Sequence, residues 1–237
     1  MLKINLTVLF LAFIIMGCNG QPNQTSRLTE RNLPKFFKEW KENSDRLAAE
    51  KHTTDTLITT ILSHEFSLSN QPQTSDEGIT PQYRVVPLKI YIYRYGMEAD
   101  TTGSINGFSY RHFEYEAMGE YETDSITPPL PLEGLYLTPK EETQLSQFLG
   151  GLKSADTLST INEANVRKLR HYIPVTYGHW GGYWWFYSFP QIQIIIVTHN
   201  VIILGRRTSW FEGDEIWYFK VGDRFIRDNT PKGIWIE

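Results

Sequence analysis

Apolar residues recur at helical spacing in two stretches near the start of the chain. The first begins at residue 33 and places apolar side chains at i, i+3, i+4 and i+7, with lysine and glutamate on the opposite face. The second, from residue 57 to residue 66, is richer in aliphatic residues. This periodicity predicts two amphipathic helices. Thr53 and Thr54 mark the expected break, although one long helix is also compatible with the pattern. The apolar positions are Leu33, Phe36, Phe37, Trp40, Leu57, Ile58, Ile61, Leu62 and Phe66.

A period of two replaces the helical pattern beyond a polar, glycine-containing stretch that ends near Pro81. Between residues 86 and 92, apolar side chains alternate with other residues, which predicts a single strand. Residues 108–121 alternate in the same way beyond a turn-rich segment, so we expect them to form its antiparallel partner. Three prolines between residues 128 and 131 end this part of the sheet, because proline cannot donate a ladder hydrogen bond.

Two further helices are predicted in the middle of the chain. Thr138 and Glu141 form a capping box around a proline, which is well tolerated in the first helical turn. Apolar residues between Leu145 and Leu152 supply the buried stripe of this helix. A second helix is expected over residues 162–172, because a proline two residues later ends the helical pattern.

The C-terminal part of the chain carries the clearest strand pattern. Its β-branched and aromatic runs lie at residues 192–197, 201–204, 216–221 and 224–227. The turns expected between them are His199-Asn200, Glu212-Gly213-Asp214 and Gly222-Asp223. Such short connections require antiparallel neighbours and therefore a meander. The whole pattern predicts an α+β fold in which N-terminal helices pack on an antiparallel, meander-like β-sheet, and it is compatible with a curved sheet.

The amino-terminal segment has the pattern of a secretory leader. Lys3 precedes an apolar stretch of eleven residues from Leu6 to Met16, broken only by Thr7. As a helix this run covers about 16 Å, roughly half of a bilayer core, so it is too short to span a membrane and has the length of a signal-peptide core. Ile15-Met16-Gly17-Cys18 ends the segment and resembles a bacterial lipobox.

This resemblance implies that the leader is removed before Cys18, whose sulfur and new amino group then carry lipid. Residues 1–17 are then a signal peptide, residues 18–31 a lipidated tether and residues 32–237 a single α+β domain. Several acyl chains would hold the protein firmly on a bilayer. Asn19 stands where the inner-membrane retention signal of enteric bacteria places aspartate, which favours the outer membrane. The alternative is an ordinary signal peptide followed by an incidental cysteine.

The composition excludes several classes of protein and of site but does not indicate a function. The chain has 237 residues, of which 41% are apolar and 21% are charged, so wholesale disorder is excluded. The formal net charge of −4 gives no electrostatic argument for a nucleic-acid partner. The lone cysteine cannot form an internal disulfide or complete a thiolate zinc site. Because the six histidines show no metal-ligand spacing, we expect neither a metal nor a cofactor.

An aromatic segment between residues 177 and 190 is the best candidate for a binding site. Flat rings with polar edges stack on sugars and grip peptides, and neighbouring glycines let a ligand approach the backbone. Consecutive aromatic residues on a strand point to both faces, so some of them leave the main core. The alternative is that they only fill the core of the sheet. The possible ligand-binding residues are Tyr177, His179, Trp180, Tyr183, Trp184 and Trp185.

Signals of catalysis are weaker. Four glutamates that share one face, three on the expected strand at 108–121 and one directly after it, could divide the acid and base roles of a glycosidase, but a row of charges on a strand is more often its solvated side. These glutamates are Glu114, Glu116, Glu120 and Glu122. Ser188 and Ser209 have aromatic neighbours but no triad context, and Arg206-Arg207 could meet an anion or keep an edge strand soluble. No nucleophile elbow or phosphate-binding glycine motif is present, so we assign no catalytic residue.

These observations favour a membrane-anchored envelope lipoprotein with a non-enzymatic domain. Acylated Cys18 would connect it to the lipid bilayer. The exported domain would bind an unknown protein or glycan, or act protectively as an immunity-type lipoprotein does. The alternative is an envelope polysaccharide hydrolase that uses a glutamate pair.

Overall fold

The computed structural model describes residues 27–50, 55–68, 78–96, 121–150, 160–178, 183–209, 211–229 and 232–236. The helices within these residues are η1 (Glu30–Asn32), α1 (Leu33–Ala49), α2 (Thr56–Leu68), α3 (Pro139–Phe148) and α4 (Thr160–Arg170). The strands are β1 (Arg84–Pro87), β2 (Ile90–Tyr95), β3 (Tyr121–Ile126), β4 (Gly134–Leu137), β5 (Thr176–Gly178), β6 (Tyr183–Trp185), β7 (Gln191–Val197), β8 (Val201–Arg207), β9 (Glu212–Val221), β10 (Arg224–Arg227) and β11 (Lys232–Ile236).

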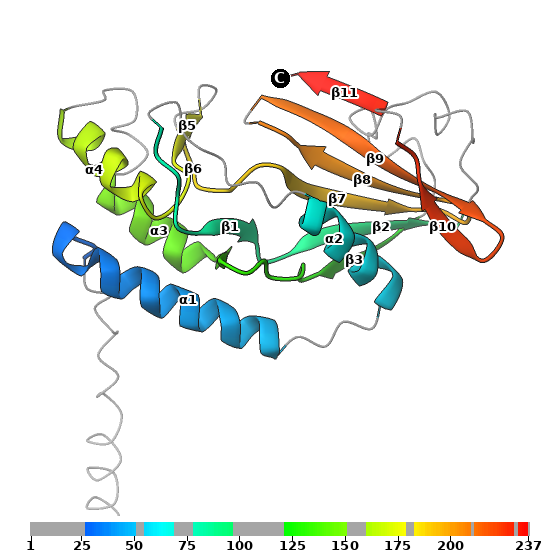
Figure 1. Cartoon of the computed structure of the whole chain (residues 1–237), viewed down its shortest axis with the longest axis horizontal. Helices are drawn as coiled ribbons and strands as arrows, with labels where there is room; N and C mark the ends of the chain where they lie inside the picture. The colour runs from blue at the N-terminus through cyan, green and yellow to red at the C-terminus, as the bar shows by residue number, and fades with distance from the viewer. Residues whose placement is uncertain are drawn as a thin grey trace, which may run out of the picture.

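The main sheet has the strand order β10-β9-β8-β7-β2-β3, and β11 also pairs with β9 (Figure 1). Strands β7 to β10 form the predicted antiparallel meander. Strand β2 lies parallel to β7, with Tyr91 opposite Ile194, and antiparallel to β3. Gly222 turns the chain between β9 and β10 with a φ of 62°, a conformation that glycine adopts without strain.

Helix α2 covers one face of the main sheet, as Figure 1 shows. Its buried residues Ile58, Ile61, Leu62 and Phe66 belong to one cluster with isoleucine and leucine side chains from β2, β3, β7, β8 and β9. Leu57, which the helical pattern places among them, is 42% exposed. The opposite face of the sheet carries a separate cluster that includes buried residues of β7, β8 and β9.

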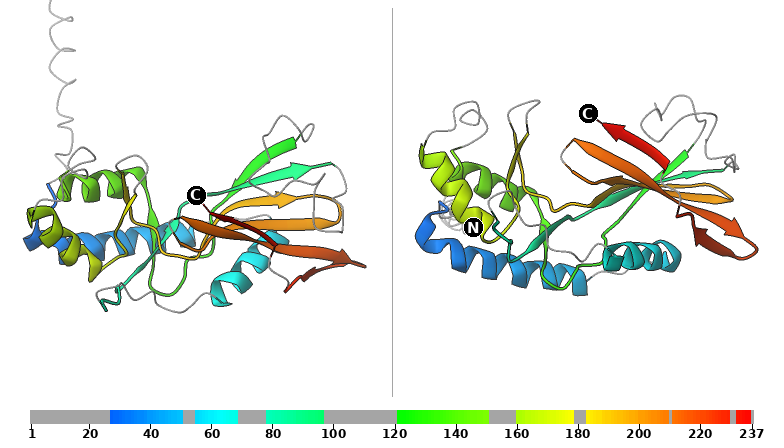
Figure 2. Two further views of the ribbon diagram at one scale, coloured as in Figure 1. Left: turned by 90° about the horizontal axis from the view of Figure 1, so that it is seen from above. Right: turned by 45° about the horizontal axis from the view of Figure 1, so that its top comes forward.

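The other three helices surround two small sheets beside the main one (Figure 2). One small sheet is the parallel pair β1–β4 and the other is the antiparallel pair β5–β6. Helix α1 joins this group through Leu33, Phe37 and Trp40, which are buried with apolar residues of α3, α4, β4 and β6. Phe37 also stacks on Tyr172, with 4.3 Å between the ring centroids.

The α+β class and the packing of helices on a sheet are therefore confirmed, but several local predictions are wrong. The predicted strand at 86–92 is divided, because Pro87 cannot donate a ladder hydrogen bond and the chain passes there from one sheet to the other. The sheet is mixed rather than wholly antiparallel. The partner of β2 is β3, while residues 108–120 of the predicted partner lie outside the described residues.

Two predictions in the C-terminal meander also need correction. Glu212-Gly213-Asp214 is not a turn but the start of β9, where Gly213 lies opposite Arg207. The turn comes earlier, and the backbone N–H of Thr208 donates to the carbonyl of Glu212. Strand β8 lies between β7 and β9, so Arg206-Arg207 does not belong to an edge strand.

Candidate functional site

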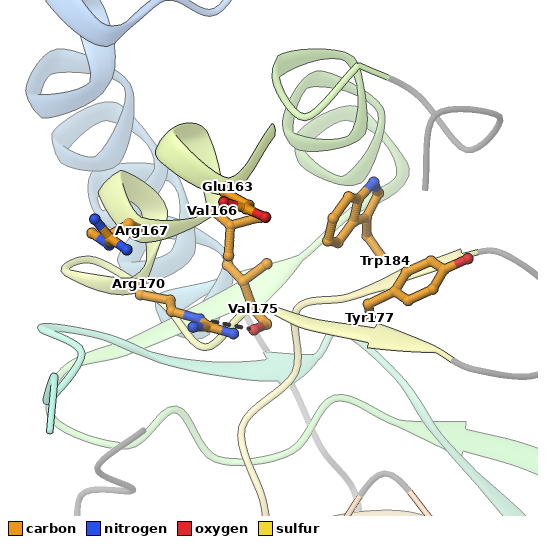
Figure 3. A pocket seen from close by; sticks show the side chains of 7 residues that line it. All are labelled: Glu163, Val166, Arg167, Arg170, Val175, Tyr177 and Trp184. Atoms are coloured by element: carbon orange, nitrogen blue, oxygen red, sulfur yellow. Dashed lines mark hydrogen bonds between the residues drawn. The ribbon is translucent and has the colours of Figure 1, made fainter. Parts of the chain in front are cut away.

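A pocket of about 270 Å³ lies between α4 and the β5–β6 pair (Figure 3). Helix α4 supplies one wall, and the two short strands with the residue preceding β5 supply the other. The lining residues are Glu163, Val166, Arg167, Arg170, Val175, Tyr177 and Trp184. Its volume suits one small group, such as a single sugar ring or a single side chain.

Tyr177 and Trp184 form the aromatic wall of the pocket. They are direct neighbours across the β5–β6 ladder, which brings their ring centroids to 5.5 Å at an interplanar angle of 59°. Tyr177 is half-buried, whereas Trp184 is only 4% exposed and belongs to the core cluster beneath α1, α3 and α4. Tyr177 therefore offers the more accessible ring, and Trp184 contributes mainly to packing.

The indole N–H of Trp184 is a buried donor. It has no hydrogen-bond acceptor among the residues that the structure describes. A buried donor without an acceptor costs about 1–3 kcal/mol relative to a satisfied one. This nitrogen has essentially no accessible surface of its own, so a ligand in the pocket does not reach it without a shift of the ring.

Helix α4 supplies the charged wall. Glu163, Arg167 and Arg170 lie at i, i+4 and i+7, which places them on one side of the helix. The Nε of Arg170 donates to the carbonyl of Val175 at 3.4 Å, which ties the helix to the start of β5. Figure 3 shows the Glu163 carboxylate on the side of the helix that faces the aromatic pair. The pocket thus combines one carboxylate, two guanidinium groups and two aromatic rings.

The structure places the six predicted ligand-binding residues differently. Tyr177 and Trp184 line the pocket. Trp185 faces away from Trp184, stacks on Phe189 with 5.8 Å between centroids and lies 5.1 Å from the guanidinium of Arg207. Tyr183 is opposite Gly178 in the β5–β6 ladder. His179 and Trp180 lie outside the described residues, as does the predicted lipidation residue Cys18.

The other sequence candidates have local structural roles. The Ser188 hydroxyl accepts a hydrogen bond from the backbone N–H of Val85 at 3.0 Å. The Ser209 hydroxyl accepts one from the backbone N–H of Glu212 in the turn before β9. Arg206 forms a two-pronged ion pair with Asp214, its partner across β8 and β9, through Nε at 2.7 Å and a second nitrogen. These contacts position strands and turns.

Most of the glutamate row lies outside the described residues, so the row stays a prediction. Glu122 lies on β3, opposite Arg94, and is exposed to solvent. Glu114, Glu116 and Glu120 lie outside the described residues. Within the described part of the chain, no group of three or more histidine, cysteine, aspartate or glutamate side chains is arranged to hold a metal ion.

Sequence reasoning missed the charged wall. The helix at 162–172 was predicted, but only from the apolar positions that anchor it to the core. The i, i+4, i+7 spacing of Glu163, Arg167 and Arg170 was a readable signal that these side chains share one face. What the sequence could not show is that β5 and β6 lie against that face.

Comparison with protein-family models, with curated proteins and with solved structures finds no match for this chain. Among the residues that the structure describes, no helix is long and apolar enough to cross a membrane.

Proposed function

We propose that this protein is a lipid-anchored envelope lipoprotein, tethered through Cys18, whose folded domain binds a glycan without cleaving it. The pocket between α4 and the β5–β6 pair carries the proposal. Arginine and glutamate side chains supply the directional hydrogen bonds that sugar hydroxyls require. Tyr177 supplies a half-buried ring for the C–H face of a sugar.

The same pocket favours binding over hydrolysis. Glycoside hydrolases of the usual kind place two carboxyl groups on either side of the scissile bond. Glu163 is the one carboxylate among the described residues that line the pocket. The role of a binding protein, with its ligand held by Arg167, Arg170 and Tyr177, needs no second acid.

The binding proposal predicts a saturable change in tryptophan fluorescence when envelope glycan fragments are titrated into the protein. Tyr177→Ala should weaken this binding at least about fivefold, because stacking of a flat ligand face on one aromatic ring contributes on the order of 1–3 kcal/mol. Tyr91→Ala is the matched control, since Tyr91 is 53% exposed on β2 in the main sheet. Equal affinities for the two variants, or no response to any glycan, would contradict a glycan site here.

The anchoring proposal predicts that Cys18→Ala releases the protein from membranes. Without the thiol no thioether to lipid can form, and a few residues of polar tether hold no affinity for a bilayer. Metabolic labelling with a fatty acid and membrane fractionation of cells that express each form would measure this. A variant that remains membrane-bound and lipid-labelled would show that the lipobox interpretation is wrong.

A further inference from the structure

The N-terminal end of the described chain lies against the C-terminal half of α4. The Lys168 ammonium contacts the Glu30 carboxylate at 2.6 Å. Leu28 and Leu33 are buried in the same cluster as Leu169. Figures 1 and 2 both show the start of α1 beside α4, at the end of the molecule opposite the β9–β10 hairpin.

The two segments that meet at this end of the molecule are together basic, although the chain as a whole is acidic. Residues 27–33 and 163–171 together hold five basic and two acidic side chains, whereas the whole chain has 23 basic and 27 acidic ones. We call the five basic residues the basic end. They are Arg27, Arg31, Arg167, Lys168 and Arg170. Arg27, Arg31 and Arg167 are exposed, and the other two are half-buried.

The basic end also contains the first described residue, Arg27, which follows Cys18 in the sequence. Eight residues lie between Cys18 and Arg27, so the chain takes nine residue steps from one to the other. A chain of nine residues spans at most about 32 Å, whatever its conformation. If Cys18 is acylated, Arg27 and its neighbours therefore stay within that distance of the bilayer surface.

We propose that the basic end lies against the anionic headgroups of the bilayer to which the protein is tethered. The proposal rests on the lipid anchor proposed above. Basic side chains held near an anionic surface are attracted to it, and the tether keeps them within reach at all times. Arg167 and Arg170 also line the pocket, so this orientation would hold the glycan site close to the membrane surface.

Two exposed histidines report this orientation. His171 directly follows α4 at the basic end, and His199 lies in the turn between β7 and β8. The protein purified from cells that express the whole coding sequence is reconstituted into vesicles of phosphatidylcholine alone or of equal parts phosphatidylcholine and phosphatidylglycerol. Carbethoxylation by diethyl pyrocarbonate then measures how accessible each imidazole is.

We expect the reactivity of His171 to fall at least about threefold on the anionic vesicles, while that of His199 is unchanged. Higher ionic strength should reverse the effect. The double variant Arg27→Glu/Arg31→Glu should restore His171 reactivity and leaves the pocket residues intact. The control Lys220→Glu/Arg224→Glu changes the same charge on two exposed residues of the distant β9–β10 hairpin and should restore nothing.

The outcomes separate the two proposals. Flotation with neutral vesicles tests the anchor alone, because the basic end has no affinity for a neutral surface. Flotation with both vesicle types and equal His171 reactivity on each would overturn the orientation and leave the anchor intact. Arg167, Lys168 and Arg170 would then serve only the C-terminal dipole of α4. Flotation with anionic vesicles only would support the basic end and overturn the anchor, and flotation with neither would overturn both.

Discussion

Trp40→Ala should lower the free energy of unfolding by about 3–5 kcal/mol, the cost of removing a large ring from a packed core. Trp40 is 2% exposed and stacks on Phe37 with 5.7 Å between centroids. Its indole N–H donates to the carbonyl of Tyr136 at 2.7 Å, and the backbone N–H of Tyr136 donates to the Ser44 hydroxyl at 3.0 Å. The substitution therefore removes both packing and one of the two polar contacts that join α1 to β4.

Urea unfolding followed by far-ultraviolet circular dichroism measures the loss without relying on tryptophan fluorescence. Trp40→Phe keeps most of the apolar ring and loses only the donor, so it should cost about 1–2 kcal/mol. Glu39→Ala on the neighbouring exposed position should change stability by less than about 0.5 kcal/mol. A loss below about 1 kcal/mol for Trp40→Ala would mean that α1 is not docked on β4 through this residue.

The sequence predicted the elements whose pattern is local. Helix α1 follows from the period of Leu33, Phe37 and Trp40, all of which are buried. Helix α3 begins at Pro139 directly after Thr138, as predicted, but the predicted capping box is wrong in detail: the Thr138 hydroxyl donates to the Glu141 carboxylate and caps no backbone N–H of the first turn. Both features depend only on residues three or four positions apart, and that range is where periodicity is informative.

The prediction failed where pairing depends on residues far apart in the chain. Alternation from residue 86 to residue 92 contains no sign that β1 pairs with β4 while β2 pairs with β7. Parallel pairing joins segments separated by long connections, so no turn sequence announces it. Pro87 was the local signal for the division of this strand.

Some residues of the candidate site could likewise be predicted from the sequence, and others could not. Tyr177 and Trp184 were found because aromatic residues are conspicuous in a sequence, and β5–β6 pairing places them together. Arg167 and Arg170 were missed because a charged helix face is ordinarily solvated, and only the tertiary position of α4 makes it a pocket wall. A charged helix face therefore indicates a binding site only when the element that lies against that face is known.

Glu65→Gln is the second substitution for which we expect a large effect, a loss of about 3 kcal/mol. Glu65 is 2% exposed on α2. Its Oε1 accepts hydrogen bonds from the Tyr218 hydroxyl at 2.6 Å and from the Nε of Arg227 at 2.7 Å, so one carboxylate joins α2 to β9 and β10. Removing its charge leaves the half-buried Arg227 guanidinium without an anion, which is why the cost exceeds that of an ordinary hydrogen bond.

The matched control is Glu39→Gln, the same substitution in an exposed ion pair. Glu39 lies 3.6 Å from Lys35 on the surface of α1, and both side chains are more than half exposed. Such pairs contribute about 0–1 kcal/mol, so the control should be close to neutral in the same urea experiment. Equal effects of Glu39→Gln and Glu65→Gln would contradict a structural role for the buried carboxylate.

Alkaline pH gives an independent readout of this contact. Burial and, next, the hydrogen bond to Glu65 raise the pKa of Tyr218 above its ordinary value of 10. Because the folded pKa is the higher one, the contribution of Tyr218 to stability is fully present below pH 10 and is lost as the pH rises through the folded value.

In Glu65→Gln the negative charge is gone while burial remains, so the pKa of Tyr218 should fall but stay above its ordinary value. Tyrosinate absorbance, taken as the difference from Tyr218→Phe in each background, measures that shift, and an unchanged titration in Glu65→Gln would show that burial alone keeps this hydroxyl neutral.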